Sequence, residues 1–132
     1  DLAKAKGARR AIPLPVAGAY HSPLMASAQA KLQAELAKAK ISSPTVTVVS
    51  NVNAQPHSTA DQISARLVEQ VTSSVRWEES MRYLLAQGFT RFIELGPGTA
   101  LSGFMKRINK EAQMLNVADV GSLEATVTAL TA

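Results

Sequence analysis

The sequence of 132 residues contains no cysteine and only two histidines, His21 and His57. The absence of cysteine excludes a disulfide framework, a thiolate zinc site and a cysteine nucleophile, and it fits a reducing cytoplasm. Two histidines also exclude a three-histidine metal site within this chain. With these counts we expect no resident metal. No stretch approaches the roughly eighteen consecutive apolar residues of a membrane helix, so we expect no membrane partner either.

Aromatic residues make up only 5% of the chain, and none is interleaved with the basic residues. Single-stranded nucleic acid binds on stacked aromatic rings, so the composition argues against such a partner. The net charge of +4 is uneven: residues 1–40 carry +5, and residues 41–132 carry −1. A basic segment can bind nucleic acid, anionic lipid or phosphorylated ligands, or it can be a solvated helix surface.

The segment Arg9–Ala17 predicts either a strand at the edge of a sheet or an extended crossover. Pro13 and Pro15 each remove a backbone donor, and a central strand does not tolerate two such losses. The segment Thr45–Val49 is β-branched throughout and predicts a buried strand. Further strands are predicted at Arg91–Leu95 and Met114–Ala118.

Helical signals alternate with these strands. Ser22 and Pro23 are typical of a helix start, with Ser22 capping the free amides, and Thr59 with Gln62 forms a capping-box pattern. The first helix has one apolar face, consisting of Met25, Ala28, Leu32, Leu36 and Ala39. Later helices are predicted at residues 60–72, 77–87, 100–109 and from 121 onward, with Leu101, Phe104, Met105 and Ile108 facing inward on the third of these. The alternation indicates an α/β fold with a largely parallel sheet.

Residues 1–6 resemble the last turns of a helix that ends at Gly7. We therefore expect the chain to begin inside an element and to be a fragment of a larger protein.

Three places in the sequence could carry chemistry. His21 precedes a helix at the end of a strand, where catalytic groups of α/β sheets collect, so it is a candidate general base or a loop histidine satisfied by backbone. The loop Gly96–Gly98 either presents amides to an anion or forms a tight turn. His57 lies in a polar loop and is interpreted as an ordinary surface residue.

A series of short motifs, in order along the chain, goes beyond these spacings. It resembles the malonyl-CoA:acyl carrier protein transacylases, with a histidine motif G-A-Y-H-S-P-L-M at residues 18–25. The other matching motifs are P-L-P-V at 13–16, V-S-N-V at 49–52, L-V-E-Q at 67–70, V-R-W at 75–77, E-L-G-P-G at 94–98, L-S-G at 101–103 and K-R-I at 106–108.

The resemblance implies a fold with two parts. Residues 18–132 would be the C-terminal part of a large hydrolase-like α/β subdomain, with a mainly parallel sheet flanked by helices. Residues 1–17 would contain the closing strand of a small ferredoxin-like subdomain. The chain has no G-x-S-x-G, so the family's serine, its oxyanion glutamine and its malonate-binding arginine would lie in an N-terminal portion.

The resemblance also implies a reaction. In this family a serine in G-H-S-x-G takes malonyl from CoA, and the phosphopantetheine thiol of acyl carrier protein then takes it from the serine. His21 matches the catalytic histidine, and Gln70 matches the residue whose backbone carbonyl orients it. No cofactor is implied, and the expected location is the cytoplasm.

Three further residues match positions with a suggested role in that family. Tyr20 matches an aromatic residue that accompanies malonyl rather than methylmalonyl selection, or its ring simply fills space. Arg9 and Arg10 match a basic pair implicated in binding carrier protein or CoA phosphates. The alternatives are a non-catalytic fragment that binds carrier protein or CoA through Arg9, Arg10 and Gly96–Gly98, a merely structural fragment, and an acyltransferase of a polyketide pathway.

Overall fold

The structure, a computed structural model, describes residues 1–13 and 15–131. Leu14, in the predicted edge strand, and Ala132, at the end of the predicted large subdomain, lie outside the described residues. The elements are α1 (Leu2–Ala5), a 3-10 turn η1 (Pro23–Met25), α2 (Ala26–Leu36), α3 (Ala60–Gln70), α4 (Trp77–Ala86), β1 (Arg91–Leu95), α5 (Ala100–Ile108), β2 (Gln113–Val117) and α6 (Val120–Thr131).

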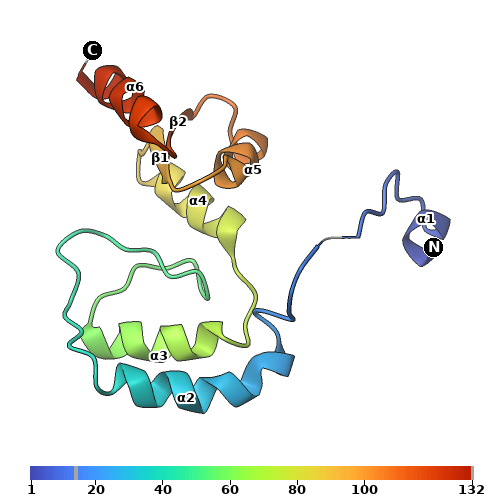
Figure 1. Ribbon diagram of the computed structural model, residues 1–132, viewed down its shortest axis with the longest axis vertical. Coiled ribbons are helices and arrows are strands. Elements are labelled where there is room, and N and C mark those ends of the chain that lie inside the picture. Colours follow the sequence, from blue (N-terminus) through green and yellow to red (C-terminus); the bar gives the residue numbers. More distant parts are fainter. Residues whose placement is uncertain (14, 132) are drawn as a thin grey trace.

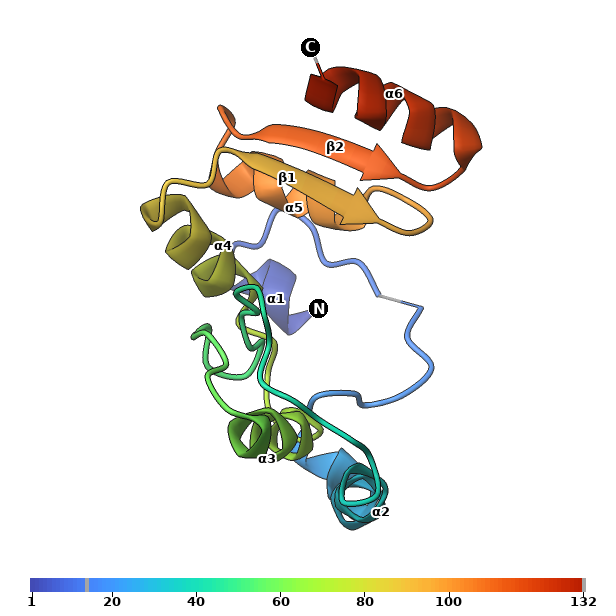
Figure 2. The same ribbon diagram turned by 90° about the vertical axis from the view of Figure 1, so that its left-hand side faces the viewer.

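A two-stranded parallel sheet organises the second half of the chain. β1 pairs with β2 in register from Arg91 opposite Gln113 to Leu95 opposite Val117. The crossover between the strands is α5, and α5 and α6 lie on opposite sides of the sheet (Figures 1 and 2). The predicted α/β fold, with a parallel sheet flanked by helices, is confirmed for this half.

The helix α4 packs against α5 and ends where the sequence predicts. Gly88 adopts φ 88°, a left-handed conformation that glycine reaches without a Cβ penalty. The amide of Phe89 then bonds the carbonyl of Leu84 at 3.2 Å, closing a Schellman cap. Beside this cap, Met105 of α5 is fully buried and Met81 of α4 is 8% exposed, so the two methionines form the core under the sheet.

The first half of the chain is built on two helices that run side by side, α2 and α3 (Figure 1). The predicted cap of α3 is confirmed, because the Thr59 hydroxyl accepts the amide of Gln62 at 3.3 Å. The predicted cap at Ser22 is wrong: its hydroxyl donates to the carbonyl of Ala19 at 2.7 Å and closes the preceding turn instead. Pro23 still occupies the first position of the 3-10 turn η1.

Two predicted strands do not form. Thr45–Val49 has only an isolated antiparallel bridge, Val49 to Pro56, within the described chain, and Val46 is 73% exposed. Arg9–Ala17 makes no strand among its described residues. A strand needs a neighbouring backbone along its length for its ladder. Residues 55–57 pair only with the end of Thr45–Val49, where the amide of His57 bonds the Val48 carbonyl at 2.9 Å, and the described residues of Arg9–Ala17 have no such partner. On α5, the inward prediction is wrong for Phe104, which is 48% exposed, whereas Leu101 faces the hollow that Met105 also lines although it is 39% exposed.

The exposed surface is large for a chain of this size. The accessible area is 9812 Å², whereas a compact monomer of 14.0 kDa exposes about 6,700 Å². Among the described residues only Val52, Ala54, Met81 and Met105 are buried apolar side chains. Leu95, at the end of β1, is 78% exposed. The apolar side chains of the sheet and helices are therefore largely left uncovered by the rest of the described residues.

This surface predicts the behaviour of the 132 residues expressed alone. Uncovered strand edges and apolar patches of this kind promote association. We expect the isolated chain to bind 8-anilinonaphthalene-1-sulfonate strongly and to sediment as aggregates, without a cooperative thermal transition. A monomer that melts cooperatively and binds no dye would show that the isolated chain folds stably without a further element to cover its apolar surface.

Candidate active site

His21 lies in the turn before η1 with a backbone φ of 59°. This left-handed conformation is unfavourable for a residue with a Cβ, so the surrounding turn must hold it. The hydrogen bond from the Ser22 hydroxyl to the Ala19 carbonyl closes that turn. The backbone thereby directs the imidazole toward the end of α3.

The imidazole of His21 meets the backbone of Gln70, a residue 49 positions further along the chain. Its Nδ1 lies 3.0 Å from the Gln70 carbonyl oxygen, so the contact expected from the sequence is present. A carbonyl oxygen can only accept, and therefore Nδ1 carries the hydrogen. The side-chain amide of Gln70 lies 3.4 Å from the same nitrogen, but it donates to the Ser73 carbonyl at 2.6 Å. Nε2 of His21 is then left as a proton acceptor.

The Gln70 carbonyl is at the C-terminus of α3, where backbone carbonyls lack partners within the helix. It accepts one further bond, from the Ser73 amide at 3.3 Å. The helix end therefore offers Nδ1 of His21 a backbone acceptor where a carboxylate could otherwise stand.

A shallow apolar hollow adjoins the imidazole. Tyr20 is 63% exposed, and its ring lies back over Gly18, where an added Cβ would come 3.2 Å from a ring carbon. The absence of a side chain at Gly18 thus permits the ring's position. The hollow is lined by Tyr20, His21, Met25, Ala28, Leu32 and Val71.

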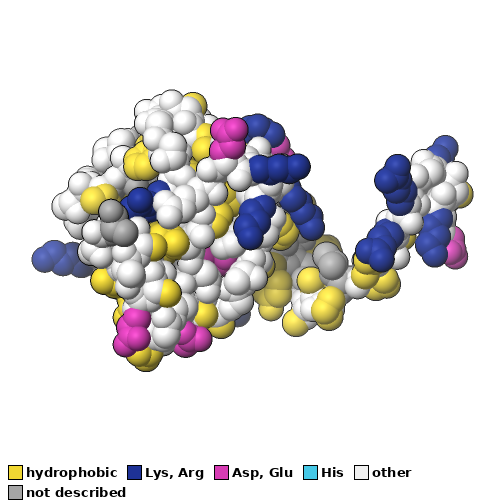
Figure 3. Space-filling view, turned by 90° about the horizontal axis from the view of Figure 1, so that it is seen from above, with side chains coloured by type: hydrophobic (Ala, Val, Ile, Leu, Met, Phe, Trp, Pro, Cys, Tyr) yellow, Lys and Arg dark blue, Asp and Glu magenta, His cyan; other side chains and the backbone are white. Residues whose placement is uncertain are grey.

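Arg9 and Arg10 are not brought to His21. Both are exposed in the segment after α1, and the structure gives their side chains no hydrogen bond or ion pair to any described residue. The N-terminal segment runs away from the rest of the molecule, and basic side chains project from it (Figures 1 and 3). Their role is not tested by this geometry and stays a prediction.

Comparisons with known proteins extend over nearly the whole chain, although no protein-family model matches it. The malonyl CoA-acyl carrier protein transacylase of Bacillus subtilis is 43% identical over 130 residues, which cover 98% of this chain and 41% of that protein. The transacylase structure from Clostridium perfringens has a TM-score of 0.91 at 39% identity, covering 98% of this chain and 41% of that one. A malonyl-transacylase solved with a type II polyketide acyl-carrier protein has a TM-score of 0.90 at 36% identity, covering 96% and 41%.

The chain is a homologue of part of the malonyl CoA-acyl carrier protein transacylases. It spans about two fifths of the length of the relatives it matches. The resemblance inferred from the sequence motifs is thereby confirmed. The division into a small subdomain (1–17) and a large one (18–132) is not tested and stays a prediction.

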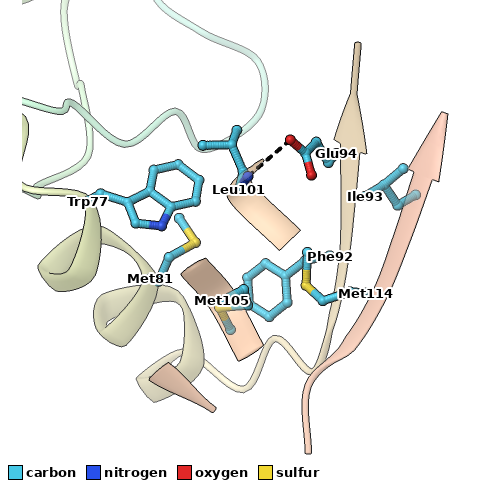
Figure 4. Close-up of a pocket in the computed structure, with 8 residues that line it drawn as sticks. All are labelled: Trp77, Met81, Phe92, Ile93, Glu94, Leu101, Met105 and Met114. Atoms are coloured by element: carbon cyan, nitrogen blue, oxygen red, sulfur yellow. Dashed lines mark hydrogen bonds between the residues drawn. The ribbon is translucent and has the colours of Figure 1, made fainter. Parts of the chain in front are cut away.

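In this transacylase homologue the loop Gly96–Gly98 forms a turn whose neighbouring amides are already occupied. The carboxylate of Glu94 accepts the amide of Leu101 at 3.1 Å (Figure 4). It also accepts the amide of Ser102 at 2.9 Å and the Ser102 hydroxyl at 2.6 Å. Gly96 and Gly98 have φ 131° and 87°, which favour glycine. Of the two sequence-based interpretations, the geometry favours the tight turn, because an anion at this helix start would meet the Glu94 carboxylate.

The same carboxylate sits at the rim of an apolar hollow between β1, α4 and α5. Trp77, Met81 and Met105 approach it from the helices, and Phe92 and Met114 approach from the strands (Figure 4). Glu94 thus ties β1 to the start of α5 at the edge of the core. Its hydrogen bonds, first those from Ser102 and then that from Leu101, hold the pKa of the Glu94 carboxyl below its ordinary value.

His57 differs from its interpretation as an ordinary surface residue. It is half-buried, and its Nδ1 is buried without a partner among the described residues. Burial, and secondly the charge of Arg66, lower the pKa of His57 from its ordinary value. His57 lines a hollow with Arg66 and Gln70, the residue that contacts His21.

Sequence reasoning missed Gln29 altogether. Its amide links α2 to α3 by bonds to the Val68 carbonyl and the Thr72 hydroxyl. The available signal was a polar residue four positions after Met25 and three before Leu32, on the apolar face of the helix.

The described residues also place limits on other kinds of site. None of their helices is long and apolar enough to cross a bilayer. No group of three histidine, aspartate or glutamate side chains comes together within 1–13 and 15–131 as metal ligands would.

Glu94 gives a prediction on stability and pH. A carboxyl whose pKa is lowered by folding stabilises the fold fully above its ordinary pKa of about 4.5, and loses that effect as pH falls through the lower native value. In the full-length protein, Glu94→Gln should lower the melting temperature at pH 7, and the difference from wild type should shrink below pH 4.5. Melting curves recorded between about pH 3 and 7, a range that includes this pKa, measure the difference between wild type and the variant.

Glu124→Gln on α6 is the matched control for this series. Glu124 is exposed, and its carboxylate has no hydrogen bond to a described residue. It should leave the melting temperature unchanged at every pH. A constant loss for Glu94→Gln across the whole range would mean that the Glu94 charge is not what stabilises the turn.

Proposed function

We propose that this chain supplies the catalytic histidine of a malonyl-CoA:acyl carrier protein transacylase, acting on a serine that lies outside these 132 residues. One observation carries the proposal: His21 Nδ1 is held at 3.0 Å by the Gln70 carbonyl, which orients the other ring nitrogen for proton transfer. The homology to transacylases supports it, and those relatives are more than twice as long as this chain.

The first half-reaction forms a malonyl-serine. Nε2 of His21 takes the proton of the serine hydroxyl while the serine oxygen attacks the thioester carbonyl of malonyl-CoA. The tetrahedral intermediate collapses with cleavage of the carbon–sulfur bond. The imidazolium then returns its proton to the departing CoA thiolate, which leaves malonyl-serine, free CoA and a neutral His21.

The second half-reaction transfers malonyl to the carrier protein. Nε2 accepts the proton of the phosphopantetheine thiol, and the thiolate attacks the serine ester. When the new carbon–sulfur bond forms and the serine oxygen leaves, His21 returns the proton to that oxygen. Both halves move one proton out and back through the same nitrogen, so the proposed chemistry needs no cofactor.

The helix end suits this exchange because it stabilises imidazolium only moderately. The Gln70 carbonyl and the α3 dipole contribute less than a buried carboxylate would, and a carbonyl cannot itself take a proton. A histidine in such an environment gives its proton back readily. A thioester is already activated toward attack, so the reaction does not demand a stronger base.

Tyr20 and the arginine pair have proposed roles around this centre. The ring of Tyr20 lies next to His21 in the apolar hollow, and a ring there would crowd a methyl branch on the malonyl α-carbon. One methyl group is worth about 1–3 kcal/mol of discrimination, so the preference for malonyl is limited. Arg9 and Arg10 would attract an acidic carrier protein by their charge.

The pathway that this transacylase serves is part of the proposal. The related transacylase solved with a polyketide acyl-carrier protein shows that both kinds of pathway use similar enzymes. We favour fatty acid synthesis in the cytoplasm, with malonyl-CoA and acyl carrier protein as the two substrates. The third partner is the portion of the enzyme that carries G-H-S-x-G.

A non-catalytic fragment is the alternative function, and one observation weighs against it. Such a fragment would use the start of α5 to hold phosphate groups, but Glu94 already occupies the amides of Leu101 and Ser102. Arg9 and Arg10 alone would remain for binding.

The role of His21 is tested by substitution in the complete transacylase. His21→Ala removes the proton acceptor, so transfer of malonyl from CoA to carrier protein should slow by about 10²–10⁴-fold. His57→Ala is the matched control and should retain near-normal turnover, because the His57 imidazole makes no hydrogen bond to His21 or Gln70 in the described chain. Near-normal turnover of His21→Ala would contradict the assignment.

The docking role is tested by charge reversal. Arg9→Glu with Arg10→Glu should raise KM for acyl carrier protein while hydrolysis of the malonyl-enzyme stays the same, and should flatten the salt dependence of the carrier step. Lys31→Glu with Lys40→Glu makes the same change in net charge on and just beyond α2. Equal effects of the two pairs at low salt would assign the effect to net charge rather than to docking.

A further inference from the structure

Gln29 joins the two helices that carry the candidate active site. It lies on α2, the helix that follows His21, and its side chain is partly buried against α3. The Nε2 amide donates to the Val68 carbonyl at 3.1 Å and to the Thr72 hydroxyl at 3.2 Å. These acceptors stand two residues before and two residues after Gln70, so Gln29 spans the turn that presents the Gln70 carbonyl.

That turn is weakly held by its own backbone. Beyond the regular part of α3, the amides of Val71, Thr72 and Ser73 each bond the carbonyl three residues earlier, at 3.3 Å. Such tightened last turns satisfy carbonyls that the helix leaves open, with poorer hydrogen-bond geometry. Additional donors are therefore needed to fix the direction of the carbonyls, and Gln29 supplies two hydrogens at this place.

The position of His21 depends on the same contact between helices. His21 is connected to α2 only through Ser22 and η1, and its own side chain is exposed, where water competes for Nδ1. The bond to Gln70 forms reliably only if α2 keeps its position along α3. Apolar contacts such as those of Met25 and Leu32 have no preferred direction, so they resist a shift of α2 along α3 only weakly. The Gln29 amide instead bonds two defined acceptors on either side of Gln70.

We propose that Gln29 is a positioning residue of the transacylase, which fixes the C-terminal turn of α3 against α2 so that the Gln70 carbonyl meets His21. The proposal rests on the proposed function. It differs from a role in packing alone, because a packing residue would affect stability without selecting the tautomer of His21.

The test uses the complete transacylase, wild type and Gln29→Leu. Nitrogen-15 NMR of labelled histidine reports the imidazole tautomer, with His21→Asn to assign the signal and His57 as a reference. Wild type should show hydrogen on Nδ1 of His21. In Gln29→Leu a larger share should carry it on Nε2, and kcat should fall about tenfold with KM for malonyl-CoA unchanged.

Two further variants keep the test decisive if Gln29→Leu is destabilised. Thr72→Val removes one acceptor, leaves Gln29 in place and should give an intermediate shift of tautomer and kcat. Gln33→Leu changes a neighbouring exposed glutamine of α2 whose side chain bonds no described residue, and it should behave as wild type.

The outcomes separate the two proposals. If Gln29→Leu and Thr72→Val keep the wild-type tautomer and kcat, Gln29 has no positioning role and the proposed function stands. The same is true if Gln33→Leu changes them equally. If wild type itself carries hydrogen on Nε2 of His21, the orientation in the proposed function is wrong, and this inference falls with it.

Discussion

A single hydrogen bond, from His21 Nδ1 to the Gln70 carbonyl, is the contact on which the functional account depends. In the proposed function it makes the end of a helix the third member of the catalytic arrangement. The features around it serve to hold its two ends: the left-handed backbone of His21, the closed turn at Ser22 and the short turn after Gln70. Because a backbone carbonyl cannot be removed by substitution, the arrangement is robust to change at position 70 but sensitive to the placement of α2 and α3.

The second constraint is the surface that the described residues leave uncovered. β1 and β2 form a sheet of two strands with helices on both sides, and Val46 and Val48 in the segment Thr45–Val49 are exposed. Parallel strands are normally buried on both faces and both edges within a larger sheet. This geometry fits a role as one portion of a larger α/β transacylase. In the proposed function the catalytic centre would then be shared, with the base on this portion and the nucleophile on the other.

Local signals in the sequence were sufficient to predict the elements whose contacts come from residues nearby in the chain. The Thr59 cap, the end of α4 and the strands β1 and β2 all depend on residues close together in the chain, and all were predicted to within about a residue. That β1 and β2 pair with each other is a finding of the structure. Thr45–Val49 was predicted as a strand because its residues suit one, but a ladder also needs a partner that the described residues do not provide.

The site shows the same limit. His21 and the Gln70 carbonyl came from the resemblance to a family, since no spacing rule brings residues 49 positions apart into contact. Gln29 and Glu94 act through bonds that depend on how helices and strands pack, so composition and periodicity gave them no role. Ser22 was assigned to a cap by its type, whereas its hydroxyl is used by the turn that holds His21.

The most direct measurement is a crystal structure of the complete transacylase, this chain together with the portion that carries G-H-S-x-G. The account predicts that Nε2 of His21 lies about 2.6–3.2 Å from the hydroxyl of that serine, while Nδ1 keeps its bond to the Gln70 carbonyl. A serine whose nearest base is another residue, with His21 Nε2 directed into solvent, would contradict it.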